Sequence, residues 1–196
     1  MSQADQERWD RRYSDGEYLP NRQPASFLSD CLPIIPVGRA LVLACGAGRN
    51  ALALAAAGFT VDAFDVSPVA IGLARADSER RGLDVNWQVV DLDEVTLERG
   101  EYDLITMFRY VNRALWSNLA GALAPNGWLM MELHLGTSRE VSGPQSEGFR
   151  VGPQELLLAF AHLRIARYEE RYEAAVPEED STALAHLLAC KGDPGW

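Results

Sequence analysis

The sequence predicts an α/β protein in which seven strands form a mostly parallel sheet with one antiparallel strand. From residue 39 to residue 134, short apolar runs alternate with stretches of good helix formers. This alternation indicates parallel strands joined by right-handed crossover helices. Two final strand-like segments, 164–173 and 182–190, predict a hairpin that completes the sheet. We therefore expect three layers, with helices on both faces of the sheet.

The most informative segment extends from Arg39 to Asp65 and predicts a strand, a glycine turn, a helix and a second strand. Residues 40–44 are apolar and suit a buried parallel strand. Gly46 and Gly48 allow the backbone to turn sharply and to approach a ligand closely. The helix ends near Gly58, and the second strand brings Asp65 to its carboxyl end, where a carboxylate can accept both hydroxyls of a ribose. This arrangement predicts a site for a nucleotide-type cofactor.

Asp65 has a second interpretation as the N-cap of the helix that follows it. We favour the ribose role, because Ser67 is already a good N-cap and Pro68 suits the first helical position.

The segments downstream indicate which cofactor the site takes. A third strand over residues 85–90 leads to Asp91-Leu92-Asp93, and a fourth strand covers residues 102–108. The turn Pro125-Asn126-Gly127 introduces a fifth strand over residues 128–134. Taken in this order, the motifs resemble those of class I S-adenosylmethionine (SAM)-dependent methyltransferases, over about residues 5–190. The stretches ACGAGRNALALAAAGFTVDAFDVSP, NWQVVDLD, YDLI and FRYVNRAL are similar to the small bacterial branch of tellurite-resistance-type methyltransferases.

The resemblance implies a three-layer α/β/α, Rossmann-like methyltransferase fold, with SAM as cofactor and S-adenosylhomocysteine (SAH) as product. It places Asp65 on the ribose, Asp91 and Leu92 at the adenine, and the glycine turn under the methionine part. Asp91 has an alternative as a plain strand-end acid, with Asp93 as the N-cap of a following helix. The expected cofactor-binding residues are Gly46, Ala47, Gly48, Asn50, Asp65, Val66, Asp91, Leu92, Phe108 and Arg109.

One position departs from the family pattern. Two residues before the Ala-Cys-Gly turn, relatives usually carry an acid that helps to hold the ammonium group of SAM, and this chain has Val42. Backbone carbonyls of the turn or a lid residue would then have to satisfy the ammonium.

The methyl acceptor is expected at the carboxyl ends of the strands, where open α/β sheets bind ligands. An arginine after the fourth strand could bind an oxyanion or carboxylate through two parallel hydrogen bonds, or could pair with a glutamate inside the fold. Residues 1–32 are expected to form an N-terminal helical cap, with Trp9 as a packing anchor. The candidate acceptor-binding residues are Tyr13, Tyr18, Arg22, Tyr110, Arg113 and His134. No residue stands out as a catalytic base, and an anionic acceptor such as a thiolate, selenite or tellurite needs none.

Composition limits the remaining alternatives. The 196 residues fit one domain, 1–196, and the net charge of −10 argues against a nucleic-acid substrate. No apolar run approaches the ~20 residues of a membrane span, and the N-terminus does not resemble a signal peptide, so we expect a cytoplasmic protein without a membrane partner. The three cysteines and three histidines lack the spacing of a metal site. The leading hypothesis is a small-molecule methyltransferase; the alternatives are a degenerate SAM-binding regulatory protein and a nucleotide-dependent oxidoreductase.

Overall fold

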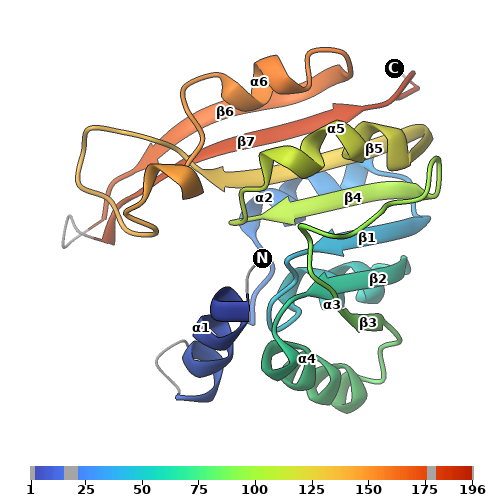
Figure 1. The fold of residues 1–196 in the computed structure, drawn as a ribbon. Helices are drawn as coiled ribbons and strands as arrows, with labels where there is room; N and C mark the ends of the chain where they lie inside the picture. The colour runs from blue at the N-terminus through green and yellow to red at the C-terminus, as the bar shows by residue number, and fades with distance from the viewer. Residues whose placement is uncertain (1–2, 16–21, 176–179, 196) are drawn as a thin grey trace.

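The computed structural model describes residues 3–15, 22–175 and 180–195, and these residues form a seven-stranded sheet (Figure 1). The strand order is β3-β2-β1-β4-β5-β7-β6, and β7 is antiparallel to both of its neighbours. The sheet therefore confirms the predicted mostly parallel arrangement with one antiparallel strand. The strands are β1 (Arg39–Leu43), β2 (Thr60–Asp65), β3 (Asn86–Val89), β4 (Tyr102–Phe108), β5 (Leu123–His134), β6 (Arg164–Glu173) and β7 (Thr182–Cys190).

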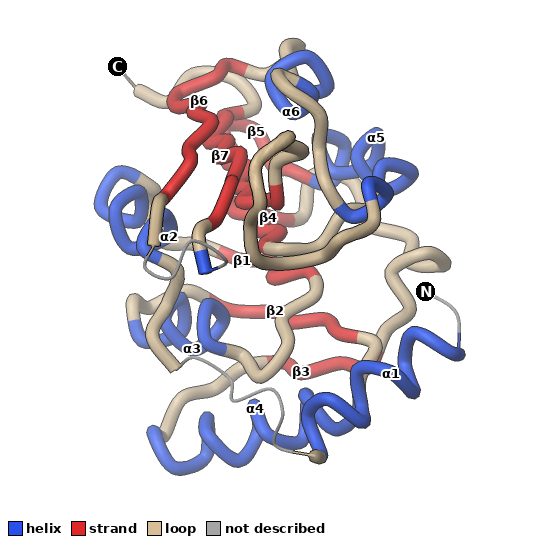
Figure 2. The backbone as a smooth tube through the Cα atoms, turned by 90° about the vertical axis from the view of Figure 1, so that its left-hand side faces the viewer, coloured by secondary structure: helices blue, strands red, loops and turns tan. Residues whose placement is uncertain are grey.

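Helices cover both faces of the sheet, as predicted for a three-layer fold (Figure 2). Alternate side chains of each buried strand point to opposite faces. In β1, Ala40 and Val42 pack with the helices of one face, and Leu41 and Leu43 pack with those of the other. The first face carries α2 (Ser26–Cys31), α3 (Arg49–Ala56) and α4 (Pro68–Arg81), and the second carries α5 (Arg113–Ala122) and α6 (Glu155–Ala159).

The expected N-terminal cap divides into two parts with different surroundings. Helix α1 (Gln3–Ser14) has no buried residue and lies beside α4, outside the layers (Figures 1 and 2). Helix α2 instead belongs to the core, because Phe27 and Leu28 are 1% and 0% exposed. A short 3-10 helix, η1 (Leu32–Ile34), follows it. Only α1 therefore has the position of a cap.

Helix α6 is short and covers only Glu155–Ala159. Gln154 adopts a left-handed conformation with φ of 59°, so the helix begins only at Glu155. After Ala159 the backbone leaves the helical conformation, and Phe160 is fully buried against the sheet. In the part of the chain that the structure describes, no helix combines the length and the apolar character that crossing a bilayer requires.

Gly48 allows α3 to lie close to the neighbouring elements. It adopts a left-handed φ of 87°, and a Cβ atom at this position would lie 2.5 Å from Cη2 of Trp87 and 3.0 Å from Cβ of Ala74. Both the backbone conformation and the packing therefore require glycine here.

We predict that Gly48→Ala lowers the free energy of unfolding by at least about 2 kcal/mol, through left-handed strain and overpacking against Trp87. Urea denaturation measures this change. Gly72→Ala is the matched control, because Gly72 lies inside α4 with nothing within 4 Å of the added methyl group. That variant should gain about 0.5–1 kcal/mol. Equal effects of the two substitutions would contradict the packing role of Gly48.

Candidate cofactor site

A cavity opens where the carboxyl ends of β1, β2 and β4 meet, between the glycine turn and helix α1. The loops that follow parallel strands converge at this edge, which is the usual ligand site of open α/β sheets. The cavity is lined by Trp9, Tyr13, Val42, Leu43, Ala44, Cys45, Gly46, Ala47, Arg49, Asn50, Asp65, Val66, Phe108, Arg109 and Tyr110.

The glycine turn is held against β2, and helix α1 closes over it. The backbone N–H of Cys45 donates to the carbonyl of Phe64 at 3.0 Å, which continues the pairing of the two strands. Gly46 has a φ of 55°, and a Cβ atom there would lie 2.6 Å from the hydroxyl of Tyr13. The absence of a side chain at position 46 therefore leaves room for the Tyr13 hydroxyl directly above the turn.

Asp65 joins the glycine turn to the beginning of α4. Its carboxylate accepts hydrogen bonds from the backbone N–H of Gly46 at 2.7 Å and of Ser67 at 2.9 Å. Burial raises the pKa of Asp65, and the hydrogen bonds from the backbone of Ser67 and Gly46 act in the opposite direction. The side chain that caps α4 is Ser67, whose hydroxyl accepts from the N–H of Ala70 at 3.1 Å. The N-cap alternative for Asp65 is therefore wrong, and its carboxylate lines the cavity.

Arg109 is held at the end of β4 by Glu132. Its φ is 58°, its backbone N–H donates to the carbonyl of Glu132 at 2.7 Å, and its Nε donates to Oε1 of the same residue at 2.8 Å. The two terminal NH₂ groups of Arg109 have no hydrogen-bond partner among the residues described in the structure. The Arg–Glu pair that the sequence left open is thus present, and it leaves one side of the guanidinium available.

Glu132 also belongs to a row of polar side chains that extends across β5, β7 and β6. Nε2 of His186 lies 3.2 Å from Oε2 of Glu132, and Nδ1 of His186 lies 3.1 Å from Oε1 of Glu169. Burial acts to raise the pKa of Glu132, but His186 and Arg109 outweigh it and lower that pKa below its usual value. The His186 ring stacks on Phe27 of α2, with centroids 4.4 Å apart. The His186 ring therefore lies between the carboxylates of Glu132 and Glu169, with Phe27 covering one of its faces.

Asp91 and Leu92 follow β3, and neither lines the cavity. The Asp91 carboxylate accepts from the N–H of Asp93 at 2.9 Å, and Leu92 is 1% exposed. The expected alternative, in which Asp93 caps a helix, is wrong, because residues 92–94 form a turn that leads on toward β4. Asp93 instead accepts from Nδ2 of Asn112 at 2.9 Å, which joins this turn to the start of α5.

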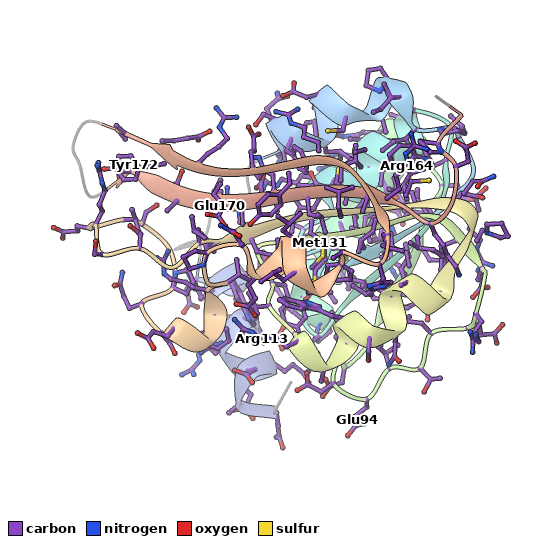
Figure 3. All side chains as sticks on the ribbon, turned by 90° about the horizontal axis from the view of Figure 1, so that it is seen from above. Glu94, Arg113, Met131, Arg164, Glu170 and Tyr172 are labelled. Atoms are coloured by element: carbon purple, nitrogen blue, oxygen red, sulfur yellow. The ribbon has the colours of Figure 1, made fainter. Side chains whose placement is uncertain are left out.

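The candidate acceptor residues are not gathered in one place. Tyr13 and Tyr110 line the cavity, Arg22 is exposed away from its lining, and Tyr18 is outside the described residues. Arg113 lies at the start of α5 (Figure 3), where its guanidinium is bonded to both carboxylate oxygens of Glu155. It also donates to the carbonyls of Gly148 and Arg150. Arg113 therefore anchors the 136–153 loop and is not among the residues that line the cavity.

His134 is buried beneath the same loop. A Cβ atom at Gly143 would lie 2.6 Å from Cε1 of the ring, so the loop covers it closely. Burial lowers the pKa of His134 to about 4, and the positive charges of Arg109 and Arg150 act in the same direction. His134 therefore fills the face of β5 beneath the loop and is not among the residues that line the cavity.

The cavity is lined by other residues as well, some of them expected from the sequence and some not. Asn50, Ala47 and Val66 line it as expected, and Oδ1 of Asn50 also accepts from the N–H of Ala25 at 2.9 Å. Trp9, expected as a packing anchor, lines the cavity as well. Arg49 was missed, although its place directly after the glycine turn could have indicated it.

Known proteins resemble this chain in sequence and in fold. A model described as a methyltransferase domain matches residues 40–127. The ubiquinone biosynthesis O-methyltransferase of Methylocella silvestris is 26% identical over 168 residues, which cover 76% of this chain and 66% of that protein. TehB from Haemophilus influenzae has a similar fold, with a TM-score of 0.73 at 19% identity over 93% of this chain and 67% of that one. An S-adenosylmethionine-dependent methyltransferase from Mesorhizobium loti gives a TM-score of 0.64 at 20% identity, over 87% of this chain and all of that one (100%).

The cavity lies at the carboxyl ends of the strands of a methyltransferase-like sheet. The mostly parallel seven-stranded sheet, the glycine turn and the acid at the end of β2 are those expected from the sequence resemblance. Residues 40–127 are thus similar to a methyltransferase domain, and the fold is similar to the folds of SAM-dependent methyltransferases.

We predict that Asp65→Ala weakens SAH binding at least about tenfold, because a hydrogen bond to a charged acceptor contributes ~1.5–3 kcal/mol. Titration calorimetry measures the affinity, and thermal unfolding measures any loss of stability. Asp62→Ala is the matched control: Asp62 is a buried carboxylate of the same strand, and it is bonded to Arg39 and Asn86 away from the cavity. This control should lose stability and retain its affinity for SAH. Unchanged affinity in folded Asp65→Ala protein would contradict the ribose role.

The low pKa of His134 predicts a pH-dependent stability. Its folded-state pKa of about 4 is below the ordinary value of 6.5. Between these values the unfolded chain binds more protons, so stability is lost as the pH falls. From about pH 6.5 to about pH 5 this one group should cost about 1.5 kcal/mol of unfolding free energy.

Urea denaturation at several pH values tests this loss. His134→Gln should flatten the dependence, whereas His162→Gln, at an exposed position, should leave it unchanged. An identical pH dependence in wild type and His134→Gln would show that His134 titrates normally in the folded protein.

Proposed function

We propose that the protein transfers the methyl group of SAM to a small anionic acceptor, such as a thiolate or a chalcogen oxyanion. The observation that carries this proposal is the unused side of Arg109. Glu132 fixes Nε of its guanidinium, and the terminal NH₂ groups have no partner among the described residues. A guanidinium held in this way can bind an oxyanion through two parallel hydrogen bonds.

The remaining titratable groups of the cavity favour an acceptor that arrives already ionised. Burial raises the pKa of Tyr110 to about 12, and burial also raises the pKa of Cys45 well above its ordinary value. Both carboxylate oxygens of Asp65 already accept backbone hydrogen bonds. In the described part of the chain, no histidine lines the cavity. None of these groups is suited to take a proton from a neutral acceptor at neutral pH.

Methyl transfer from a sulfonium needs alignment and exclusion of water more than acid–base chemistry. Alignment alone can correspond to effective molarities of ~10⁵–10⁸ M. Tyr13 lies above the glycine turn, and Trp9 and Tyr13 pack one helical turn apart with centroids separated by 6.1 Å. We propose that α1 closes the cavity over the sulfonium and the acceptor, and that Phe108 and Arg109 flank them.

The name of one relative suggests a second kind of acceptor. One relative is named for O-methylation in ubiquinone biosynthesis, which makes small phenols a second class of acceptor to test. The net charge of −10 disfavours nucleic acid as the acceptor, and we propose a small molecule in the cytoplasm. The domain extent 1–196, with α1 as its cap, is part of the same proposal.

The proposal predicts turnover with anionic acceptors in a screen of thiols, selenite, tellurite and small phenols with labelled SAM. Methylated product and SAH are both measured. Turnover confined to phenols would contradict an anionic acceptor, and SAH binding without any turnover would favour a regulatory SAM-binding protein.

With the best anionic acceptor, we predict that Arg109→Gln lowers kcat/KM at least about tenfold, through loss of a charge-assisted contact. The matched control is Arg39→Gln, because Arg39 is also paired with buried Asp62 but lies at the opposite ends of the strands. An equal loss in both variants would indicate a general effect on the fold.

A further inference from the structure

The charges that line the cavity are unequally compensated. Three lining residues are charged: Arg49, Asp65 and Arg109. Asp65 accepts two backbone hydrogen bonds, and Arg109 is paired with Glu132. Arg49 is partly buried and has no hydrogen bond or ion pair with any residue described in the structure. A cation withdrawn from water without a counter-ion is unfavourable, so Arg49 is a natural partner for an anion supplied by a ligand.

The position of Arg49 indicates which part of the ligand it meets. It is the first residue of α3 and directly follows the glycine turn. Gly46 and Ala47, three and two residues before it in that turn, line the same cavity. The first-turn N–H groups and the helix dipole add positive potential at this end, which strengthens the preference for an anion.

On the other side of the turn, within the part of the chain that the structure describes, no side chain could bind a cationic group of the ligand in the way that Arg49 could bind an anionic one. Val42, the last residue but one of β1, lines the cavity and is 3% exposed within the apolar core. Among the described lining residues the single carboxylate is Asp65, which lies at the end of β2. The cavity next to the turn therefore has a cation for a carboxylate group but no carboxylate for an ammonium group.

We propose that Arg49 binds the α-carboxylate of the amino-acid end of SAM, and that the protein recognises this end by its carboxylate rather than by its ammonium. This inference rests on the proposed function only in placing SAM in this cavity, and it is independent of the acceptor. Arg49 is thus a specificity-determining residue for the cofactor, and it compensates for Val42.

Titration calorimetry with three ligands tests the proposal. Two of the ligands are analogues that each lack one group of the third. The three ligands are SAH, its decarboxylated analogue, which retains the amine, and its deaminated analogue, which retains the carboxylate. For the wild type, loss of the carboxylate should weaken binding at least about tenfold, and loss of the amine less than about threefold.

Arg49→Gln should weaken SAH to the level of the decarboxylated analogue and leave the affinity for that analogue unchanged. Arg49→Lys should retain part of the preference for the carboxylate, because it keeps the charge without the planar fork. Val42→Asp should make binding depend on the amine, so that the deaminated analogue binds more weakly than SAH. Arg109→Gln is the comparator and should preserve the carboxylate preference.

Several outcomes would overturn the inference. A wild type indifferent to the carboxylate would do so, as would an Arg49→Gln variant that keeps the wild-type preference. An equal loss with all three ligands would show that Arg49 acts only on the fold, and loss of the preference in Arg109→Gln would assign the carboxylate to Arg109. If the wild type does not bind SAH at all, the proposed cofactor site is wrong. If SAH binds but the carboxylate preference does not depend on Arg49, only the role of Arg49 is wrong.

Discussion

The buried carboxylate of Asp65 holds together the segments that form the cofactor site. One oxygen accepts from the glycine turn at Gly46, and the other accepts from Ser67 at the start of α4. The Ser67 hydroxyl in turn donates to Asp10, which fixes α1 at the same point. Asp65 therefore joins the turn to the helix that follows β2, and Ser67 joins that helix to the outer helix α1. A ribose bound there would add its hydroxyls to a carboxylate already oriented by the backbone, so little reorganisation would accompany binding.

A second set of contacts connects the cavity to the far edge of the sheet. Arg109, Glu132, His186 and Glu169 follow one another from the end of β4 to β6, and Phe27 of α2 covers the histidine. A buried charge is tolerated only when it is paired, and the buried carboxylate of Glu132 has this partner in Arg109. The consequence for the site is geometric, because Arg109 can present its terminal NH₂ groups to a ligand only while Glu132 holds Nε.

Much of the fold was predictable from local patterns. Apolar runs of five or six residues between helix-forming segments identify buried parallel strands, and the predicted 102–108 strand coincides with β4. The placement of Asp65 was also predictable, because it depends on the end of one strand. Contacts between segments that are distant in the sequence were not predictable. Arg113 and Glu155 are far apart in the sequence, and nothing local indicates that they pair.

The surroundings of His134 and α2 depended on tertiary packing in the same way. Burial of His134 depends on Gly143, in a loop whose course local periodicity does not specify. The apolar residues of α2 could have covered the cofactor or the sheet, and only the stacking of Phe27 on His186 shows that they cover the sheet.

The most direct test of the account is the crystal structure of the protein with SAH. We expect the ribose hydroxyls within hydrogen-bonding distance of the Asp65 carboxylate, and the amino-acid end beside the turn formed by residues 44–49. SAH bound away from the carboxyl ends of β1 and β2, or with its ribose out of reach of Asp65, would contradict the placement of the cofactor site.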